Sequence, residues 1–184
     1  MAALERRVLI DGKEQLSDLR QSSQVTQLLQ VLSNCGCIAI KDAVNAPDNP
    51  DNLSDDNILQ NEQILRNEVV LQFLRRARPH GRYALIHRQL HTTSQGDRKW
   101  RKANNWENMQ AGDRLQGIYC CHILGARDAT YKLEFQSPSQ IARTLTLNGR
   151  DIVLITGPTL WRIPEPNVPQ AAPDMVEIRY LWMD

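Results

Sequence analysis

Apolar and polar positions follow two periods along the chain, and the first forty residues contain both. Val8-Leu9-Ile10 before Asp11-Gly12 predicts a short strand that ends in a turn. Leucines at helical spacing predict a helix over residues 13–33. Small and β-branched residues over 35–40 predict a buried strand. We therefore expect a strand, a helix and a second strand in this part of the chain.

The next segment predicts a surface loop and a second helix. Two prolines and a cluster of Asn and Asp make residues 45–53 an acidic surface loop. Ser54 stands at an N-cap position, and apolar residues at helical spacing follow it up to Phe73. Pro79 disfavours helical geometry just before it, so we expect the helix to end near Arg75–Arg78.

After residue 81 the period becomes that of strands. Tyr83–Leu90 alternates loosely, and residues 130–135 alternate as a half-buried strand. The break at Gly125–Asp128 would let this strand pair with Ile118–Leu124. Leu145 and Leu147 lead into Asn148-Gly149, which predicts a hairpin with Ile152–Ile155. One face of a last strand should carry Val176, Ile178, Tyr180 and Trp182.

These elements predict a single α+β domain over residues 1–184. Two N-terminal helices precede an antiparallel β-sheet that dominates the C-terminal half. A proline-rich loop over 157–173 interrupts the strands, and connections of that length are uncommon unless they are functional or held by a partner.

The sequence argues against a membrane-spanning protein and a secreted protein, and its net charge at first argues against a protein that binds polyanions. The longest aliphatic stretches, such as Ile152–Ile155, are far shorter than the roughly 20 residues that cross a bilayer. Charged residues stand where a secretory signal would have its apolar core, so we expect a cytoplasmic protein with free thiols. A net charge of +1 argues against a protein dedicated to binding polyanions.

The distribution of charge reverses that last exclusion. Residues 42–62 hold six acidic residues and no Lys or Arg, whereas residues 75–102 hold nine Lys or Arg against Asp97 alone. The two blocks either neutralise each other or leave a basic segment for a partner, because fields of this kind are local. Cations with interleaved tryptophans are typical of nucleic-acid contacts. The residues predicted to contact nucleic acid or an acidic partner are Arg75, Arg76, Arg78, Arg82, Arg88, Arg98, Lys99, Trp100, Arg101, Lys102 and Trp106.

Candidate catalytic and metal-binding residues are few. His80, His87 and His91 lie in the basic segment and would be the general acid and base of a small metal-independent ribonuclease. Cys35-Gly-Cys37 and Cys120-Cys121-His122 lack the ligand spacing of a zinc site and are expected in the core. Neither a phosphate loop nor a nucleophile elbow is present, so we predict no enzyme, no cofactor and no metal.

Large side chains gather in the proline-rich loop and at the C-terminus. Trp161, Arg162, Tyr180 and Trp182 are of the types enriched at protein interfaces, which predicts a docking surface. The alternative is that they close the sheet, because a terminal strand has to pack somewhere.

The order of the pieces after residue 81 resembles a known family. A strand Arg82–His87, a basic stretch Arg98-Lys-Trp-Arg101 and the closing residues Glu177–Asp184 are similar to small Csx-type accessory subunits of type III-D CRISPR effector complexes. The resemblance implies a non-catalytic subunit of an antiviral ribonucleoprotein. Its partners would be the backbone subunits, the large polymerase-like subunit and possibly CRISPR RNA. Alternatives are the ribonuclease above and a scaffold protein that binds an acidic protein partner.

Overall fold

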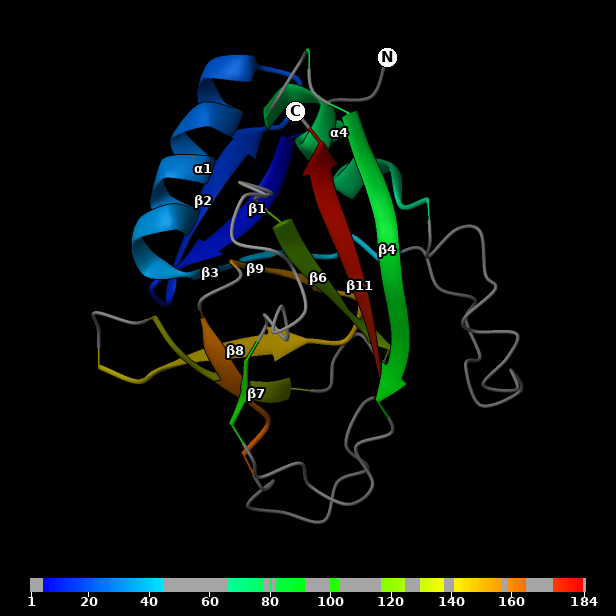
Figure 1. The fold of residues 1–184 in the computed structure, drawn as a ribbon. Helices are drawn as coiled ribbons and strands as arrows, with labels where there is room; N and C mark the ends of the chain where they lie inside the picture. Colours follow the sequence, from blue (N-terminus) through cyan, green and yellow to red (C-terminus); the bar gives the residue numbers. More distant parts are fainter. Residues whose placement is uncertain are drawn as a thin grey trace.

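A computed structural model arranges the chain in three layers: helices, a seven-stranded sheet and a four-stranded sheet (Figure 1). The structure describes residues 5–44, 66–77, 80, 82–91, 100–102, 117–124, 130–137, 141–156, 159–164 and 174–183. Within these residues the protein is α+β, and the sheets dominate.

The seven-stranded sheet has the order β2-β1-β3-β9-β6-β11-β4, and all its neighbours are antiparallel. Its N-terminal half is formed by a hairpin and a short buried strand, and its other half by strands from the rest of the chain. The strands are β1 (Glu5–Ile10), β2 (Lys13–Asp18), β3 (Cys37–Ile40), β4 (Arg82–His91), β6 (Gly117–Leu124), β9 (Ile152–Thr156) and β11 (Asp174–Met183).

The four-stranded sheet has the order β5-β10-β7-β8. Its strands are β5 (Arg101–Lys102), β7 (Thr130–Gln136), β8 (Arg143–Asn148) and β10 (Leu160–Arg162). From β4 to β11 the chain crosses from one sheet to the other at every connection except that between β7 and β8. Eight strands that alternate in this way between two facing sheets form a jelly roll.

Two helices cover the outer face of the seven-stranded sheet. Helix α1 (Ser22–Cys35) and helix α4 (Glu68–Ala77) share one core with this face. Gly36 ends α1 in the left-handed conformation at φ +84°, and its N–H donates to the Leu32 carbonyl. The core of this layer includes Val25, Leu28, Leu32, Val70, Phe73, Val8, Ile38, Ile40, Leu154, Val176 and Ile178.

A second core lies between the two sheets. The four-stranded sheet contributes Leu133, Phe135, Leu145, Leu147 and Trp161, and the facing strands contribute Cys37, Ala39, Cys121, Ile123, Val153 and Ile155. Alternation along each strand separates the two cores, because successive residues belong to opposite faces. Ile152 and Leu154, for example, join the helix-side core, whereas Val153 and Ile155 join the inter-sheet core.

Two helix predictions need correction. The predicted helix over 13–33 is wrong in its first turns, since Lys13–Asp18 forms β2 and the helix starts only at Ser22. The predicted helix from Ser54 is not one continuous element, because Arg66 and Asn67 lie outside any helix. The Asn67 side-chain oxygen accepts from the backbone N–H groups of Val69 and Val70 and so caps α4. Ser54 and the loop 45–53 lie outside the described residues.

The two predicted strand pairings are also wrong. Residues 118–124 and 130–135 do form strands, but β6 pairs with β9 and β11, whereas β7 pairs with β8 and β10. The turn at Asn148-Gly149 connects β8 to β9 across the two sheets and makes no hairpin. Both errors have one cause: local turn signals mark where the chain reverses, but the sheet that a strand joins depends on distant strands.

No helix among the described residues is long and apolar enough to span a membrane. The strand prediction at the C-terminus is confirmed for Val176 and Ile178, which are both buried on one face. The pairing of β11 with β4 shifts register between Arg179 and Tyr180, where Ile86 of β4 is the extra residue, whereas the register of β11 with β6 is unbroken from Asp174 to Leu181.

Candidate functional site

A ladder of polar side chains crosses the outer face of the four-stranded sheet. The Arg162 guanidinium carbon lies 4.6 Å from the centroid of the Trp100 ring, and Arg162 Nε donates to Glu134 Oε2 at 2.5 Å. Glu134 and Arg162 are direct cross-strand partners. Trp100, predicted to stack on nucleic-acid bases, therefore stacks on an arginine of its own chain.

The pairing of β5 with β10 shows which residue of β5 occupies a position on the inter-sheet face. Arg101 is the register partner of Trp161, which is 2% exposed and part of the inter-sheet core. Residues directly opposite each other in an antiparallel pair share a face. The position of Arg101 is therefore on the inter-sheet face, and that of Lys102 is on the outer face with Trp100.

The end of the seven-stranded sheet formed by β11 and β4 brings further polar positions to the inter-sheet face. Val176 and Ile178 of β11 belong to the helix-side core, so Glu177 and Arg179 occupy positions on the other face. Glu177 is paired with Cys121, whose burial in the inter-sheet core agrees with this assignment. The register pairs Glu177 with Gln89 and Arg179 with His87 and Tyr119, and it pairs His91 with Met175 on the same face.

The composition of the inter-sheet face thus changes across the sheet. Over β3, β9 and β6 the described positions are apolar and buried. At β11 and β4 the register assigns acidic, basic and imidazole residues to the same face. We call these positions the polar half of the inter-sheet face: they are those of Glu177, Arg179, His87, Gln89, His91 and Tyr119, with that of Arg101 on the facing sheet. They are the candidate functional site.

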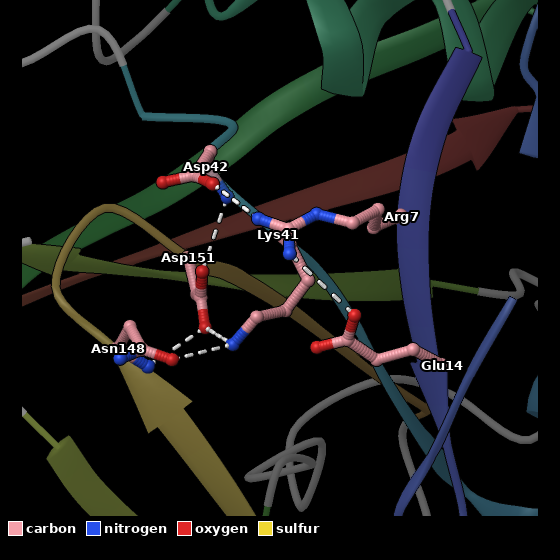
Figure 2. Close-up of polar contacts among 6 residues, drawn as sticks. All are labelled: Arg7, Glu14, Lys41, Asp42, Asn148 and Asp151. Carbon is pink, nitrogen blue, oxygen red and sulfur yellow. Dashed lines mark hydrogen bonds and ion pairs between the residues drawn. The ribbon is translucent and has the colours of Figure 1, made fainter. Parts of the chain in front are cut away.

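A buried ion pair lies where the chain crosses from β8 to β9. Lys41 Nζ donates to Asp151 Oδ2 at 2.5 Å and to Asn148 Oδ1 at 2.9 Å, and the Lys41 and Asp151 side chains are 6% and 0% exposed (Figure 2). The Asp151 carboxylate also accepts from the backbone N–H groups of Asp42 at 3.1 Å and Asn148 at 2.8 Å. The groups that form these hydrogen bonds belong to Lys41 and Asp42, which directly follow β3, and to Asn148 and Asp151 in the turn between the sheets.

We call this cluster of Lys41, Asn148 and Asp151 the latch, because it connects the end of β3 to the turn between the two sheets. Asp42 and Arg150, next to Lys41 and Asp151 in the chain, have left-handed backbones at φ +49° and +71°. Non-glycine residues adopt that region at a cost, which the surrounding bonds have to offset. Arg7 extends the cluster at the surface. Its guanidinium nitrogens lie 2.8 Å from Asp42 Oδ2 and 3.6 Å from Glu14 Oε2 (Figure 2).

Three of the cysteines lie in the core, as predicted, and the side chain of Cys120 lies outside what the structure describes. Cys35, Cys37 and Cys121 are free thiols and buried. Burial raises the pKa of Cys35 and, more strongly, that of Cys37, which keeps both thiols protonated and unreactive. Among the described residues no group of three His, Cys, Asp or Glu could hold a metal ion.

The structure places the predicted contact residues in different surroundings. Arg75 and Arg76 are exposed in the last turn of α4, and Arg82 and Arg88 are exposed on β4. Arg78, Arg98, Lys99 and Trp106 lie outside the described residues. Contact of the basic segment with nucleic acid or an acidic partner stays a prediction.

The residues of the predicted protein interface also lie in different surroundings. Trp161 is buried between the sheets, so the alternative that it closes the core holds for this residue. Arg162 is engaged by Trp100 and Glu134 on the outer face. Tyr180 and Trp182 occupy positions in β11, and their side chains lie outside what the structure describes. The candidate ribonuclease histidines are not brought together, since His80 is an exposed turn residue ahead of the strand that carries His87 and His91.

Sequence reasoning missed Glu177, Arg179 and Tyr119 as site residues and Lys41 with Asp151 as a latch. A signal for the first group was present, because Glu177 and Arg179 alternate with buried aliphatic residues of a strand that is central to the sheet. No signal existed for the latch, whose two charges are 110 residues apart.

Comparisons with known proteins give a likeness to solved structures. No protein-family model and no curated protein matches the chain. Among solved structures, a prolyl 4-hydroxylase from Phytophthora capsici matches with a TM-score of 0.54 and 14% identity, over 92% of this chain and 67% of that one. An N-substituted L-amino acid dioxygenase from Burkholderia ambifaria matches over 97% of this chain and 96% of that one, with 10% identity and a TM-score of 0.44. Its complex with alpha-KG matches over 98% of each chain, with 10% identity and a TM-score of 0.43.

The fold overturns the predicted function. A likeness over 92% of the chain to a prolyl 4-hydroxylase contradicts the predictions of a non-catalytic CRISPR accessory subunit and of a chain that is no enzyme. The resemblance to Csx-type subunits depended on the order of strands and basic stretches after residue 81. Strand order along the chain is shared by many two-sheet folds, so it carried little information about function.

The residues of the inter-sheet face do not fit the iron site of one large group of oxygenases. Non-haem iron oxygenases hold the metal with two histidines and one carboxylate. His87 and His91 are four residues apart on one strand, roughly 13 Å, too far to share an ion. His122 is paired with Ile152 and Val176, which places its position on the helix side. No histidine in the chain is followed two residues later by Asp or Glu.

Proposed function

We propose that the chain is an oxidoreductase of the oxygenase type, and that its substrate binds between the two sheets at the polar half of the inter-sheet face. The observation that carries the proposal is the likeness in fold to a prolyl 4-hydroxylase, which extends over 92% of the chain. Fold by itself does not determine chemistry, so the proposal also needs a site.

The polar half supplies that site. β11 lies between β6 and β4, and a central strand of a two-sheet fold normally presents apolar residues to the facing sheet. The positions of Glu177 and Arg179 depart from that rule next to the aromatic Tyr119 and the imidazole of His87. Polar positions beside an apolar core are common in small-molecule sites.

Each group would have a distinct role toward a substrate. Arg179 would bind a carboxylate or another anionic group, since a guanidinium presents a fork that matches a carboxylate. Glu177 or His87 would accept or donate a proton at the reacting end. The apolar core over Trp161 and Phe135 would exclude water from the closed side of the site.

Oxygen uptake tests the proposal. Purified protein is incubated with proline-containing peptides and a 2-oxo acid, with and without Fe²⁺, and dissolved oxygen is followed with an electrode. We expect substrate-dependent oxygen uptake that Arg179→Met lowers at least tenfold. Arg88→Met is the matched control, because Arg88 is an exposed arginine on the neighbouring strand, and its position is paired with Ile178 of the helix-side core. Folded protein that shows no substrate-dependent uptake with any peptide or 2-oxo acid contradicts the proposal.

A cytoplasmic location remains part of this proposal. It is supported by the free thiols Cys35, Cys37 and Cys121, which persist in a reducing compartment. Contacts with CRISPR effector subunits or CRISPR RNA stay untested predictions, and the oxygenase proposal makes no use of them.

A further inference from the structure

We infer that the latch is a site of covalent modification, at which the Lys41 amine and the Asn148 side-chain amide join in an isopeptide bond with Asp151 as the proton carrier. The inference is independent of the proposed function, because the latch contributes no residue to the polar half of the inter-sheet face. It starts from a buried amine, that of Lys41, which the oxygenase proposal does not use.

The amine and the amide are already in contact. Lys41 Nζ lies 2.9 Å from Asn148 Oδ1, and Figure 2 shows the two side chains pointing toward each other. The amide carbon is one C=O bond, about 1.2 Å, beyond that oxygen, so the amine lies within about 4 Å of the atom that it would attack. Reacting atoms in a near-attack geometry are about 3–3.5 Å apart. A small rotation of the Asn148 side chain completes the approach.

Asp151 is placed to transfer the protons. Its Oδ2 accepts from Lys41 Nζ at 2.5 Å and from the Asn148 backbone N–H at 2.8 Å. Its Oδ1 accepts from the Asp42 backbone N–H at 3.1 Å. The carboxylate is therefore fixed against both the amine and the residue that carries the amide. A general base in this position makes a lysine nucleophilic, because the ammonium form has no lone pair with which to attack.

Burial favours the reactive form of the pair. The Lys41 and Asp151 side chains are 6% and 0% exposed, and their chain neighbours Ile40 and Ile152 are fully buried. Charges lose their hydration in such surroundings, which brings the neutral pair of amine and carboxylic acid closer in energy to the ion pair than it is in water. Asn148 is half-buried, so ammonia released from it reaches solvent.

The reaction balances without an oxidant or any other co-reactant. The Lys41 ammonium gives a proton to the Asp151 carboxylate, and the resulting amine attacks the Asn148 amide carbon. A new C–N bond forms, the C–N bond to the side-chain NH₂ breaks, and Asp151 passes the two protons that Nζ loses to the leaving nitrogen. The products are a secondary amide between residues 41 and 148, a carboxylate at Asp151 and one ammonium ion. The ion pair of the latch is the state that precedes this reaction.

The bond would connect the two sheets covalently. Lys41 directly follows β3 of the seven-stranded sheet, and Asn148 ends β8 of the four-stranded sheet, 107 residues further along the chain. Cross-links that close long loops restrict the unfolded chain. An amide also persists in a reducing compartment, where a disulfide does not.

Mass spectrometry of the intact protein tests the inference. Purified protein is incubated over several days and its mass is compared with that of the unmodified chain. We expect a species lighter by about 17 Da, the mass of the ammonia lost, and a tryptic digest in which the segment containing Lys41 stays joined to the peptide 144–150. Lys41→Met and Asp151→Ala should each abolish this species.

Asp42→Asn is the matched control. It removes the neighbouring carboxylate, which is 44% exposed and paired with Arg7, at a left-handed position that Asn tolerates. The cross-link should form in this variant as in the parent protein. If Lys41→Met fails to fold, Lys41→Arg keeps the positive charge, and it should also lack the cross-link because a guanidinium does not deprotonate.

Three results would overturn the inference. The first is folded protein that loses no mass. The second is a loss of about 18 Da, the mass of water, which would join Lys41 to Asp151 in place of Asn148. The third is a loss of about 17 Da that persists in Lys41→Met, since a succinimide formed by attack of the Gly149 backbone nitrogen on Asn148 needs no lysine.

Discussion

The buried latch between Lys41 and Asp151 makes the sharpest prediction about stability. Asp151→Asn keeps the shape of the side chain but leaves the Lys41 ammonium, 6% exposed, without its counter-ion. Breaking a buried ion pair by removing one partner typically costs about 3–5 kcal/mol. That loss is a large part of the roughly 5–15 kcal/mol that stabilises an ordinary domain.

A double-mutant cycle separates the pair from its surroundings. Lys41→Met removes the ammonium and retains an unbranched side chain, and Asp151 then keeps only its backbone donors at Asp42 and Asn148. We expect a cost of about 3 kcal/mol for Lys41→Met. The double variant should lose no more than the worse single variant, which gives a coupling of at least about 3 kcal/mol. In the double variant the side chains at positions 41 and 151 are both neutral, so no unpaired charge is left buried.

Urea unfolding followed by circular dichroism measures these free energies, and an unchanged m-value confirms that the folded state stays compact. Arg7→Met is the matched control. The Arg7–Asp42 pair adjoins the latch, but its side chains are 54% and 44% exposed, so its loss should cost at most about 1 kcal/mol. Equal losses in Asp151→Asn and Arg7→Met would show that burial does not determine the strength of these pairs and would refute the reasoning.

Three further predictions concern a glycine, a carboxylate and the outer ladder. Gly36→Ala should cost more free energy of unfolding than Gly12→Ala, because an added Cβ at Gly36 would lie 2.4 Å from Thr159 Oγ1, whereas nothing lies within 4 Å at Gly12. Both glycines share the left-handed penalty of about 1–2 kcal/mol, so equal losses in urea unfolding would contradict the contact. The hydrogen bond from the Arg20 side chain lowers the pKa of Asp18 from its ordinary value of 3.8 to about 2. This depressed pKa stabilises the fold at neutral pH, and the contribution is lost as the pH falls from the ordinary value towards 2. Carboxyl NMR titration should show a higher pKa for Asp18 in Arg20→Ala, and an unchanged midpoint would exclude Arg20 as the cause. Trp100→Leu should cost about 0.5–1 kcal/mol in the parent protein and close to nothing in an Arg162→Met background. The same loss in both backgrounds would rule out the stacking.

Local features of the sequence predicted several elements well. The strand before Asp11-Gly12, the buried strand ending at Ile40 and the strand from Tyr83 to Leu90 are present. The alternation of Leu145 and Leu147 also marked core positions, since both are buried between the sheets. The residues 13–18 were assigned to a helix because Leu16 fits helical spacing, but Leu16 is an exposed residue of an edge strand.

The candidate site was only partly predictable. Arg101 was named as a contact residue along with Lys102, and the sequence could not separate them because both belong to one basic run. The register against β10 places Arg101 beside buried Trp161 and Lys102 beside Leu160. Glu177 and Arg179 were passed over because a charged residue on a terminal strand is ordinary when the strand lies at an edge. β11 is instead enclosed by β6 and β4.

The sequence by itself determined most of the longer strands and several of their buried residues, because side chains alternate with a period of two wherever a strand forms. It missed β2, which it assigned to a helix, and β10, which it assigned to a loop. Only the tertiary structure decided how the strands pair. A turn such as Asn148-Gly149 reverses the chain equally well in a hairpin and in a crossing between sheets. The choice here agrees with contacts more than a hundred residues apart, Lys41 with Asp151 among them. Those distant pairings put the positions of Glu177 and Arg179 on the inter-sheet face of one sheet and that of Arg101 on the inter-sheet face of the other, and the proposed function depends on these positions.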